Sequence, residues 1–293
     1  MEAKKINIDE WSYLGAGSTA TSYGNKYDGK LFLKLNKKDY PVEATIEEYN
    51  AQRVFSELGL PLPKVYDFVT DGERYGYTAE RVKGKISFAR ILSQEPDRME
   101  ELCSRFTEMV EDIHRIPADA SRMLDLKKYL EKEIGDLSYV PSDVAEKIRA
   151  YIEELDGGCT CLHGDLNPGN LICYENKDYW IGINTLIYGD PCWDVADMYV
   201  LCHCIPDQAI SELYHLDSGT LKSFFELFKK KYFGEAWNSP SVEDKIKHAA
   251  MIKCSVMVRK DPSKAEYIIP MIRGKRFRSL IAMRLYGMKR SHK

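Results

Sequence analysis

The eight residues His163-Gly-Asp-Leu-Asn-Pro-Gly-Asn170 constrain the fold of this chain more than any other segment. Asp, Asn, Pro and Gly favour turns, so the segment predicts a tight, irregular loop. Short apolar runs at Cys161-Leu162, Asn170–Cys173 and Tyr179–Ile183 predict short strands on both sides of it. We therefore expect a polar loop that is held in place between strands.

The 82 residues at the start of the chain predict several short strands and one helix. Trp11–Leu14 and Thr21–Tyr23 predict a hairpin around a glycine-rich turn, and a second hairpin is expected over Lys64–Val82. Between them, Leu31–Leu35 predicts a strand with one lysine at its centre, and Glu43–Leu58 predicts an amphipathic helix that stops at the following glycine.

Helical periodicity dominates the rest of the chain. The helices expected first after residue 82 cover Arg98–His114, Leu124–Leu137 and Ser142–Leu155. We therefore predict an α+β fold with two lobes. Residues 1–82 would form an N-lobe with a small antiparallel sheet and one helix, and residues 83–293 a larger, mainly helical C-lobe.

Composition sets only wide limits on the class of protein. Of the 293 residues, 44% are apolar and 30% charged, and the formal net charge is −3, as in ordinary soluble globular proteins. No signal peptide and no apolar run of about 18 residues is present, so we expect a cytoplasmic protein without a membrane partner. The bulk charge does not indicate nucleic acid, although Lys and Arg gather after Lys245.

Three groups in this sequence match the needs of phosphoryl transfer. That reaction requires an Asp near a hydroxyl, a ligand for Mg²⁺ and positive charge at the phosphates. His163-x-Asp165-x-x-x-x-Asn170 has the spacing of a kinase catalytic loop, in which Asp orients the hydroxyl and Asn binds the metal. Lys34, at the centre of a strand, is costly to bury unless it is paired or faces a ligand.

The loop resembles the HGDLxPxN motif of the aminoglycoside phosphotransferase and choline kinase family, which has a protein-kinase-like fold. The resemblance covers about residues 10–200 and includes Gly189-Asp-Pro-Cys-Trp-Asp194, similar to the family's GDPxxDLA segment. It implies ATP and Mg²⁺ as cofactors, Asp165 as the catalytic base and Asn170 as a metal ligand. By the same resemblance His163 and Asp194 would brace the loop by hydrogen bonding.

The resemblance also assigns residues to the nucleotide. Lys34 would contact the phosphates and pair with Glu48, or alternatively with Glu47. Backbone N–H groups of the turn that contains Gly15, Gly17 and Ser18 would approach the phosphate oxygens. Backbone groups of Glu80 and Val82 would bond to the edge of the adenine ring.

The pattern breaks at Gly182. Seven residues before the Gly of the GDP segment, the family has an Asp that is its principal Mg²⁺ ligand, and this position is Gly182 here. Asn184 is an alternative ligand, because two residues further along a strand the side chain returns to the same face. Otherwise Gly182 is a deliberate substitution in an active enzyme, or the chain is a pseudokinase that binds nucleotide without turnover.

The expected partner is a small-molecule hydroxyl acceptor such as a sugar, an amino alcohol or an aminoglycoside-like compound. The basic C-terminal end favours a neutral or anionic acceptor over a polycation. Aromatic candidates for the acceptor site are Tyr199, Tyr214, Trp237 and Tyr286, each also explained by helix packing. The hypothesis from another class is a regulatory module whose response to nucleotide is read by a partner.

Overall fold

The computed structural model describes residues 1–17, 19–155 and 157–274. The chain divides into two compact units, one formed by Met1–Gln94 with His163–Leu186, the other by Glu95–Leu162 with the chain from Ile187 onward. The loop at residues 163–170 therefore belongs to the first unit. The lobes proposed from the sequence, 1–82 and 83–293, group the chain differently and stay a prediction.

The first unit contains two sheets, with strand orders β1-β5-β6-β4-β3-β2 and β11-β10-β7. Every strand pair except β1–β5 is antiparallel. The elements are β1 (Lys4–Lys5), a 3₁₀ turn (Ile8–Glu10), β2 (Trp11–Ala16), β3 (Ala20–Asn25), β4 (Leu31–Asn36), α1 (Val42–Glu57), β5 (Val65–Thr70), β6 (Tyr75–Glu80), β7 (Ile86–Ser87), α2 (Phe88–Gln94), β10 (Leu171–Tyr174) and β11 (Lys177–Trp180).

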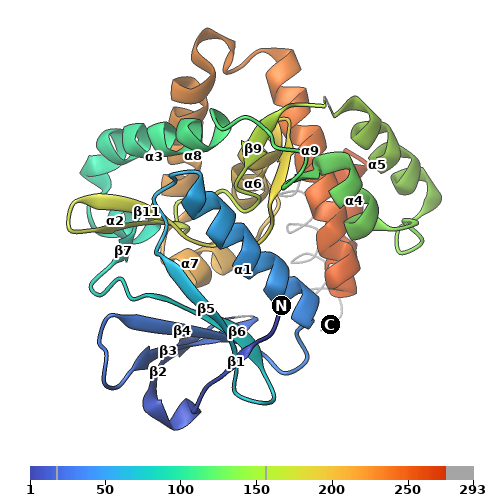
Figure 1. The fold of residues 1–293 in the computed structure, drawn as a ribbon. Helices are drawn as coiled ribbons and strands as arrows, with labels where there is room; N and C mark the ends of the chain where they lie inside the picture. The colour runs from blue at the N-terminus through green and yellow to red at the C-terminus, as the bar shows by residue number, and fades with distance from the viewer. Residues whose placement is uncertain (18, 156, 275–293) are drawn as a thin grey trace, which may run out of the picture. The chain divides into compact units, whose positions relative to one another are not determined.

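The two faces of the larger sheet are buried against different parts of the chain. One face carries Trp11, Leu33, Leu35 and Val69, which pack with apolar residues of the N-terminal segment. The opposite face contributes Phe68, Tyr77 and Ala79, and these pack with Tyr49 and Ile46 of α1. Helix α1 thus lies against β5 and β6 (Figure 1). Alternation of side chains along β4 places Lys34 on the α1 side.

Helix α1 ends where the sequence predicts. Gly59 has φ +86°, a conformation that favours glycine. The Leu60 N–H donates to the Phe55 carbonyl at 3.2 Å and the Gly59 N–H to the Ser56 carbonyl at 3.1 Å, as in a Schellman motif. The glycine stop therefore fixes the length of the helix that carries Glu48.

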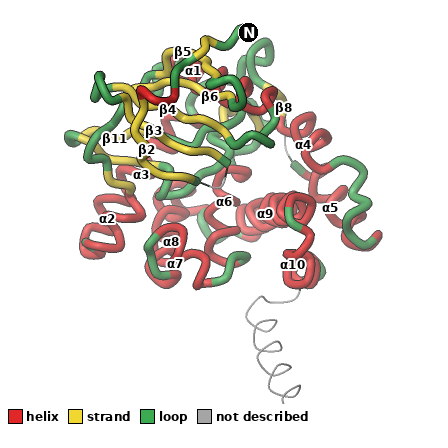
Figure 2. Tube along the Cα trace, turned by 90° about the horizontal axis from the view of Figure 1, so that it is seen from below, coloured by secondary structure: helices red, strands yellow, loops and turns green. Residues whose placement is uncertain are grey.

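The second unit is mainly helical, with one small sheet of order β8-β12-β9. One core cluster joins α4, α5, α6, α9 and α10, and α9 lies beside α5 and α10 (Figure 2). The elements are a 3₁₀ turn (Pro96–Arg98), α3 (Met99–His114), β8 (Leu124–Asp125), α4 (Leu126–Ile134), α5 (Ser142–Glu154), β9 (Thr160–Leu162), β12 (Ile187–Gly189), α6 (Cys192–His203), α7 (Asp207–Tyr214), α8 (Ser218–Phe233), a 3₁₀ turn (Gly234–Ala236), α9 (Pro240–Lys260), a 3₁₀ turn (Pro262–Lys264) and α10 (Ala265–Ile272).

The predicted fold class is confirmed: an antiparallel-rich sheet with one helix on its face precedes a mainly helical part. Of the aromatic acceptor candidates, Tyr286 lies outside the described residues, as does most of the basic end. No helix within the described ranges is long and apolar enough to cross a membrane.

Buried thiols of the second unit predict a loss of stability in alkali. Burial raises the pKa of Cys103, Cys161 and Cys202 to about 12, from an ordinary value of 9.0. Folding therefore favours the neutral thiol, and this contribution is complete below pH 9 and lost as the pH rises toward 12. We expect the free energy of unfolding, measured with urea under reducing conditions, to fall as the pH rises from about 9 toward 12. The fall should be smaller in Cys202→Ala and unchanged in the control Cys159→Ala, which removes an exposed thiol.

Candidate nucleotide and catalytic site

A pocket of about 680 Å³ opens in the first unit, and every residue that lines it belongs to that unit. The predicted residues Gly15, Lys34, Glu48, Glu80 and Val82 all line it. Apolar side chains from the sheet complete the walls, namely Leu14, Phe32, Val65 and Ala79, together with Ile181. The volume and the mixture of apolar walls with a few polar groups suit a small-molecule ligand.

Lys34 and Glu48 form an ion pair inside this pocket. The Lys34 side chain is 21% exposed and that of Glu48 only 4%, so the carboxylate is the more deeply buried partner. Glu48 also accepts a hydrogen bond from the Tyr77 hydroxyl at 2.9 Å. Glu48, rather than the alternative Glu47, is therefore the partner of Lys34.

Helix α1 presents a second buried polar side chain one turn after Glu48. Gln52, which is 6% exposed, donates through Nε2 to the Ile183 carbonyl at 2.8 Å. The same helix thus holds both the strand that carries Lys34 and the segment that follows β11. Residues four apart lie on one face of a helix, which is why a single helix makes both contacts.

The backbone groups predicted to bond the adenine edge lie at the end of β6 and just after it. The Glu80 N–H donates to the Lys64 carbonyl and the Arg81 N–H to the Lys30 carbonyl, both at 2.7 Å. No described residue accepts a hydrogen bond from the Val82 N–H. Val82 therefore offers an open backbone donor at the pocket wall.

The residues of the glycine-rich turn differ in their position relative to the pocket. Gly15 lines the pocket, and a Cβ added there would meet no atom within 4 Å. Gly17 does not line the pocket, and its N–H donates to the Ala20 carbonyl at 2.8 Å. Ser18 lies outside the described residues. The structure therefore brings Gly15 to the predicted site but not Gly17.

The carboxylate of Asp165 is exposed and is oriented by two amides of its own loop. Asn170 Nδ2 donates to Asp165 Oδ2 at 2.8 Å, and Asn167 Nδ2 lies 3.3 Å from Asp165 Oδ1. Asn167 is 2% exposed, and its own Oδ1 accepts from the Gly169 N–H at 2.9 Å. The loop thereby holds a carboxylate in one orientation while leaving it accessible, as a base for a small acceptor requires.

The two residues expected to brace the loop lie in different units. In the first unit His163 Nδ1 accepts from the Asp165 N–H at 3.2 Å, and its ring packs edge-on against Trp180 with centroids 4.7 Å apart. Asp194 belongs to the second unit, where its Oδ2 lies 3.1 Å from His114 Nε2. His163 therefore contacts the loop backbone, and the bracing role of Asp194 stays a prediction.

The backbone at Gly182 favours glycine for two physical reasons. Its φ is +80°, which L-amino acids with side chains rarely adopt. A Cβ there would lie 2.7–2.8 Å from the side-chain amide of Asn170, which hydrogen bonds to Asp165 hold in place. This backbone therefore does not accommodate a carboxylate at residue 182, and Asn184 is left as the candidate from the sequence.

Gly182→Ala should be more destabilising than an alanine at another glycine of positive φ. We expect a loss of about 1–3 kcal/mol in the free energy of unfolding, because left-handed strain adds to the contact with Asn170. Gly59→Ala is the matched control, since Gly59 has φ +86° and open space around it. Urea denaturation of both variants measures the difference. Equal losses would contradict a steric role for Asn170.

The protein groups near Asn170 do not form a metal site by themselves. Mg²⁺ is usually held by one or two carboxylates together with phosphate oxygens. Asp165 is the carboxylate of this loop, and no described residue donates a hydrogen bond to Asn170 Oδ1, which faces Gly182. Within the described ranges, no cluster of three His, Cys, Asp or Glu side chains could bind a metal. We therefore assign no chemical step to a metal.

Sequence reasoning missed three residues of this site: Gln52, Tyr77 and Asn167. Asn167 stands in the motif itself, and its place two residues after Asp165 was the available signal for a side-chain turn. Tyr77 and Gln52 contact partners far away in the sequence, so no local pattern indicated them.

Comparisons with known proteins identify the family and the fold. The model of the phosphotransferase enzyme family matches residues 10–222. Among solved structures, aminoglycoside phosphotransferase APH(4)-Ia superimposes with a TM-score of 0.64 at 12% identity, covering 93% of each chain. A choline/ethanolamine kinase family protein from Mesorhizobium loti gives 0.57 at 16% identity, covering 95% of this chain and 86% of that one.

A third solved structure is the amicoumacin kinase hAmiN in complex with AMP-PNP, Ca²⁺ and Ami, with a TM-score of 0.60 at 16% identity. It covers 94% of this chain and 91% of its own. No curated protein matches the sequence. The fold is the protein-kinase-like fold of these solved structures. The chain belongs to the phosphotransferase enzyme family.

Proposed function

We propose that this protein transfers the γ-phosphate of ATP to a hydroxyl group of a small molecule. The observation that carries the proposal is the pairing of Lys34 with Glu48 in a pocket of nucleotide size. The same unit carries an exposed, oriented Asp165. A buried ion pair is a poor source of stability, so its place at a ligand pocket favours a role in binding.

In the proposed reaction Asp165 accepts the proton of the acceptor hydroxyl. The oxygen then forms a bond to the γ-phosphorus as the bond to the bridging oxygen of ADP breaks, and ADP leaves with the electron pair. Asn167 and Asn170 keep the carboxylate of Asp165 aimed in one direction. Lys34 would offset the charge of the phosphates.

Nucleotide recognition in this proposal uses the sheet of the first unit. The base would lie between the apolar walls, with its edge bonded to the backbone of Glu80 and Val82, and the phosphates would pass Gly15 toward Lys34. Mg²⁺, when bound, supplies charge neutralisation at the phosphates. Asn170 is the proposed protein ligand, with the phosphate oxygens of the nucleotide providing most of the remaining donors.

The acceptor is proposed only as a class: a sugar, an amino alcohol or an aminoglycoside-like alcohol. One similar solved structure is a complex with hygromycin B and another a complex with streptomycin. These structures are 13% and 17% identical to this chain, so their similarity concerns the fold and does not select a substrate. A screen across these compounds is therefore needed to select among them.

A second candidate function is a nucleotide-binding regulatory module. The observation that favours it is that no three His, Cys, Asp or Glu side chains of the described residues form a metal-binding cluster, at Asn170 or elsewhere, whereas an efficient Mg²⁺-dependent enzyme would need carboxylates there. Such a module needs the nucleotide pocket but does not need Asp165 as a catalytic base.

Titration of ATP binding with Mg²⁺ separates the two functions. For the phosphotransferase we expect ATP to bind more tightly with Mg²⁺ and to be hydrolysed slowly in the absence of an acceptor. Tight binding that is indifferent to Mg²⁺, with no hydrolysis over hours, would support the regulatory module instead. Isothermal calorimetry and detection of ADP provide the two measurements.

A further inference from the structure

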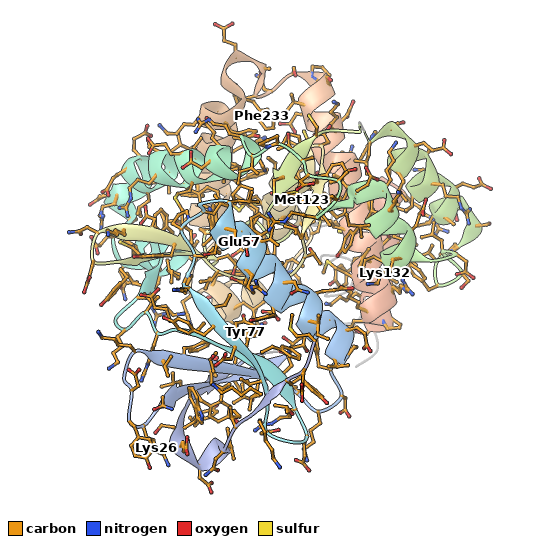
Figure 3. All side chains as sticks on the ribbon, in the orientation of Figure 1. Lys26, Glu57, Tyr77, Met123, Lys132 and Phe233 are labelled. Carbon is orange, nitrogen blue, oxygen red and sulfur yellow. The ribbon has the colours of Figure 1, made fainter. Side chains whose placement is uncertain are left out.

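Tyr77 occupies a place in the pocket that the phosphotransferase assignment does not explain. It lies on β6 directly opposite Lys34 of β4, so both side chains project from the same face of the sheet. The residue is 7% exposed and lines the pocket beneath α1 (Figure 3). A buried tyrosine hydroxyl normally requires a partner, and here the partner is a catalytic-site carboxylate.

One oxygen of Glu48 serves both Lys34 and Tyr77. Glu48 Oε1 accepts from the Lys34 ammonium and also from the Tyr77 hydroxyl, the latter at 2.9 Å. The Lys34 Nζ lies 5.8 Å from the centre of the Tyr77 ring, within the range of a cation–π contact. Burial, reinforced by the Glu48 carboxylate, raises the pKa of Tyr77 well above its usual value. Its hydroxyl therefore remains a donor.

Sharing this oxygen affects how strongly Glu48 holds Lys34. A buried carboxylate attracts a nearby cation more strongly than an exposed one, because little water screens the charges. A second donor to the same oxygen offsets part of that charge and fixes the carboxylate in position. Without the Tyr77 hydroxyl, the full charge of Glu48 would attract Lys34 more strongly, and the Glu48 carboxylate would be less firmly positioned. Lys34 would then be less available to a triphosphate.

We propose that Tyr77 is a positioning residue that makes Lys34 available to the phosphates of the nucleotide. The inference rests on the proposed function, since it concerns the same pocket. By this proposal the Tyr77 hydroxyl strengthens binding of the triphosphate and does not affect binding of the adenine base. A merely structural hydroxyl would instead affect ATP and adenosine alike.

The test compares the affinities of ATP and adenosine in the full chain. In Tyr77→Phe the ratio of ATP affinity to adenosine affinity should fall by roughly three- to tenfold, the range of one hydrogen bond, with adenosine affinity unchanged. Tyr49→Phe is the matched control. Its hydroxyl donates to the Tyr66 carbonyl at 2.8 Å, and its ring lies 6.2 Å from that of Tyr77. The control should keep the parent ratio.

The variant Lys34→Met distinguishes a failure of the Tyr77 positioning role from a failure of the proposed function. If Tyr77 acts through Lys34, adding Tyr77→Phe to Lys34→Met should leave the ratio where Lys34→Met alone puts it. An unchanged ratio in Tyr77→Phe, or equal losses for ATP and adenosine, overturns the positioning role. A parent that does not prefer ATP to adenosine, with no effect of Lys34→Met, overturns the proposed function itself.

Discussion

Asp165→Ala is expected to lower the rate of phosphoryl transfer by a factor of roughly 10²–10⁴, the usual contribution of a general base. The Asp165 side chain is exposed, and its two carboxylate oxygens accept hydrogen bonds from the side-chain amides of Asn167 and Asn170 in the same loop. Removal should therefore change catalysis more than folding. Initial rates of ADP release with a saturating acceptor, together with the ATP dissociation constant, provide the measurement.

The control for Asp165 is Asp67→Ala in the same unit. Asp67 is an exposed carboxylate that pairs with Lys4 at 3.0 Å on the sheet, away from the pocket lining. We expect the parent rate in this variant. A rate loss below threefold in Asp165→Ala, relative to this control, would remove Asp165 from the role of base.

Lys34→Met is expected to affect both stability and nucleotide binding. It leaves the buried carboxylate of Glu48 without its cation, which should cost about 3 kcal/mol of unfolding free energy. ATP affinity should fall by roughly ten- to a hundredfold, because a charge-assisted contact to the phosphates is lost. Urea denaturation and calorimetry of ATP binding measure the two effects separately.

The double variant Lys34→Met/Glu48→Gln distinguishes the two roles of the lysine. Glutamine keeps an oxygen that can accept from the Tyr77 hydroxyl but carries no charge, so most of the lost stability should return. ATP affinity should stay low, since the cation is still absent. Recovery of ATP affinity in the double variant would mean that Lys34 acts only as the structural partner of Glu48.

Local patterns predicted the elements of the first unit well. The glycine after α1 ends that helix, and alternation along Leu31–Leu35 placed a single lysine on one face of a strand. Glu48 was preferred over Glu47 because it begins a run that resembles the family's helix, and the ion pair with Lys34 agrees. These features depend on residues near one another in sequence or on one buried face, which periodicity reports directly.

Long-range pairing explains what the sequence did not predict. Residues 163–186 group with the first unit because β10 pairs with β7 and the Trp180 N–H donates to the Pro61 carbonyl at 2.9 Å. Neither contact leaves a local pattern. The position of Gly17 off the pocket follows from its bond to Ala20, a turn detail that glycine spacing alone does not specify.

Gly182 shows the limit of counting residues along a motif. Spacing from the GDP segment identified this position as a missing carboxylate, but a positive φ and the nearby Asn170 amide make glycine the residue that this backbone accepts. Counting residues along a motif does not reveal insertions or bends that shift a strand, whereas backbone angles reveal them. Asn184, which is exposed, is therefore the remaining position from the sequence for a metal-directed substitution, Asn184→Asp.

The proposed transfer of phosphate to a small alcohol can be measured directly. Mass spectrometry would follow sugars, amino alcohols and aminoglycosides after incubation with ATP, Mg²⁺ and the full chain. We predict a phosphate monoester on at least one compound with the parent and its loss with Asp165→Ala. Tight ATP binding with no phosphorylated product from any compound class, and with ATP left intact, would contradict the account.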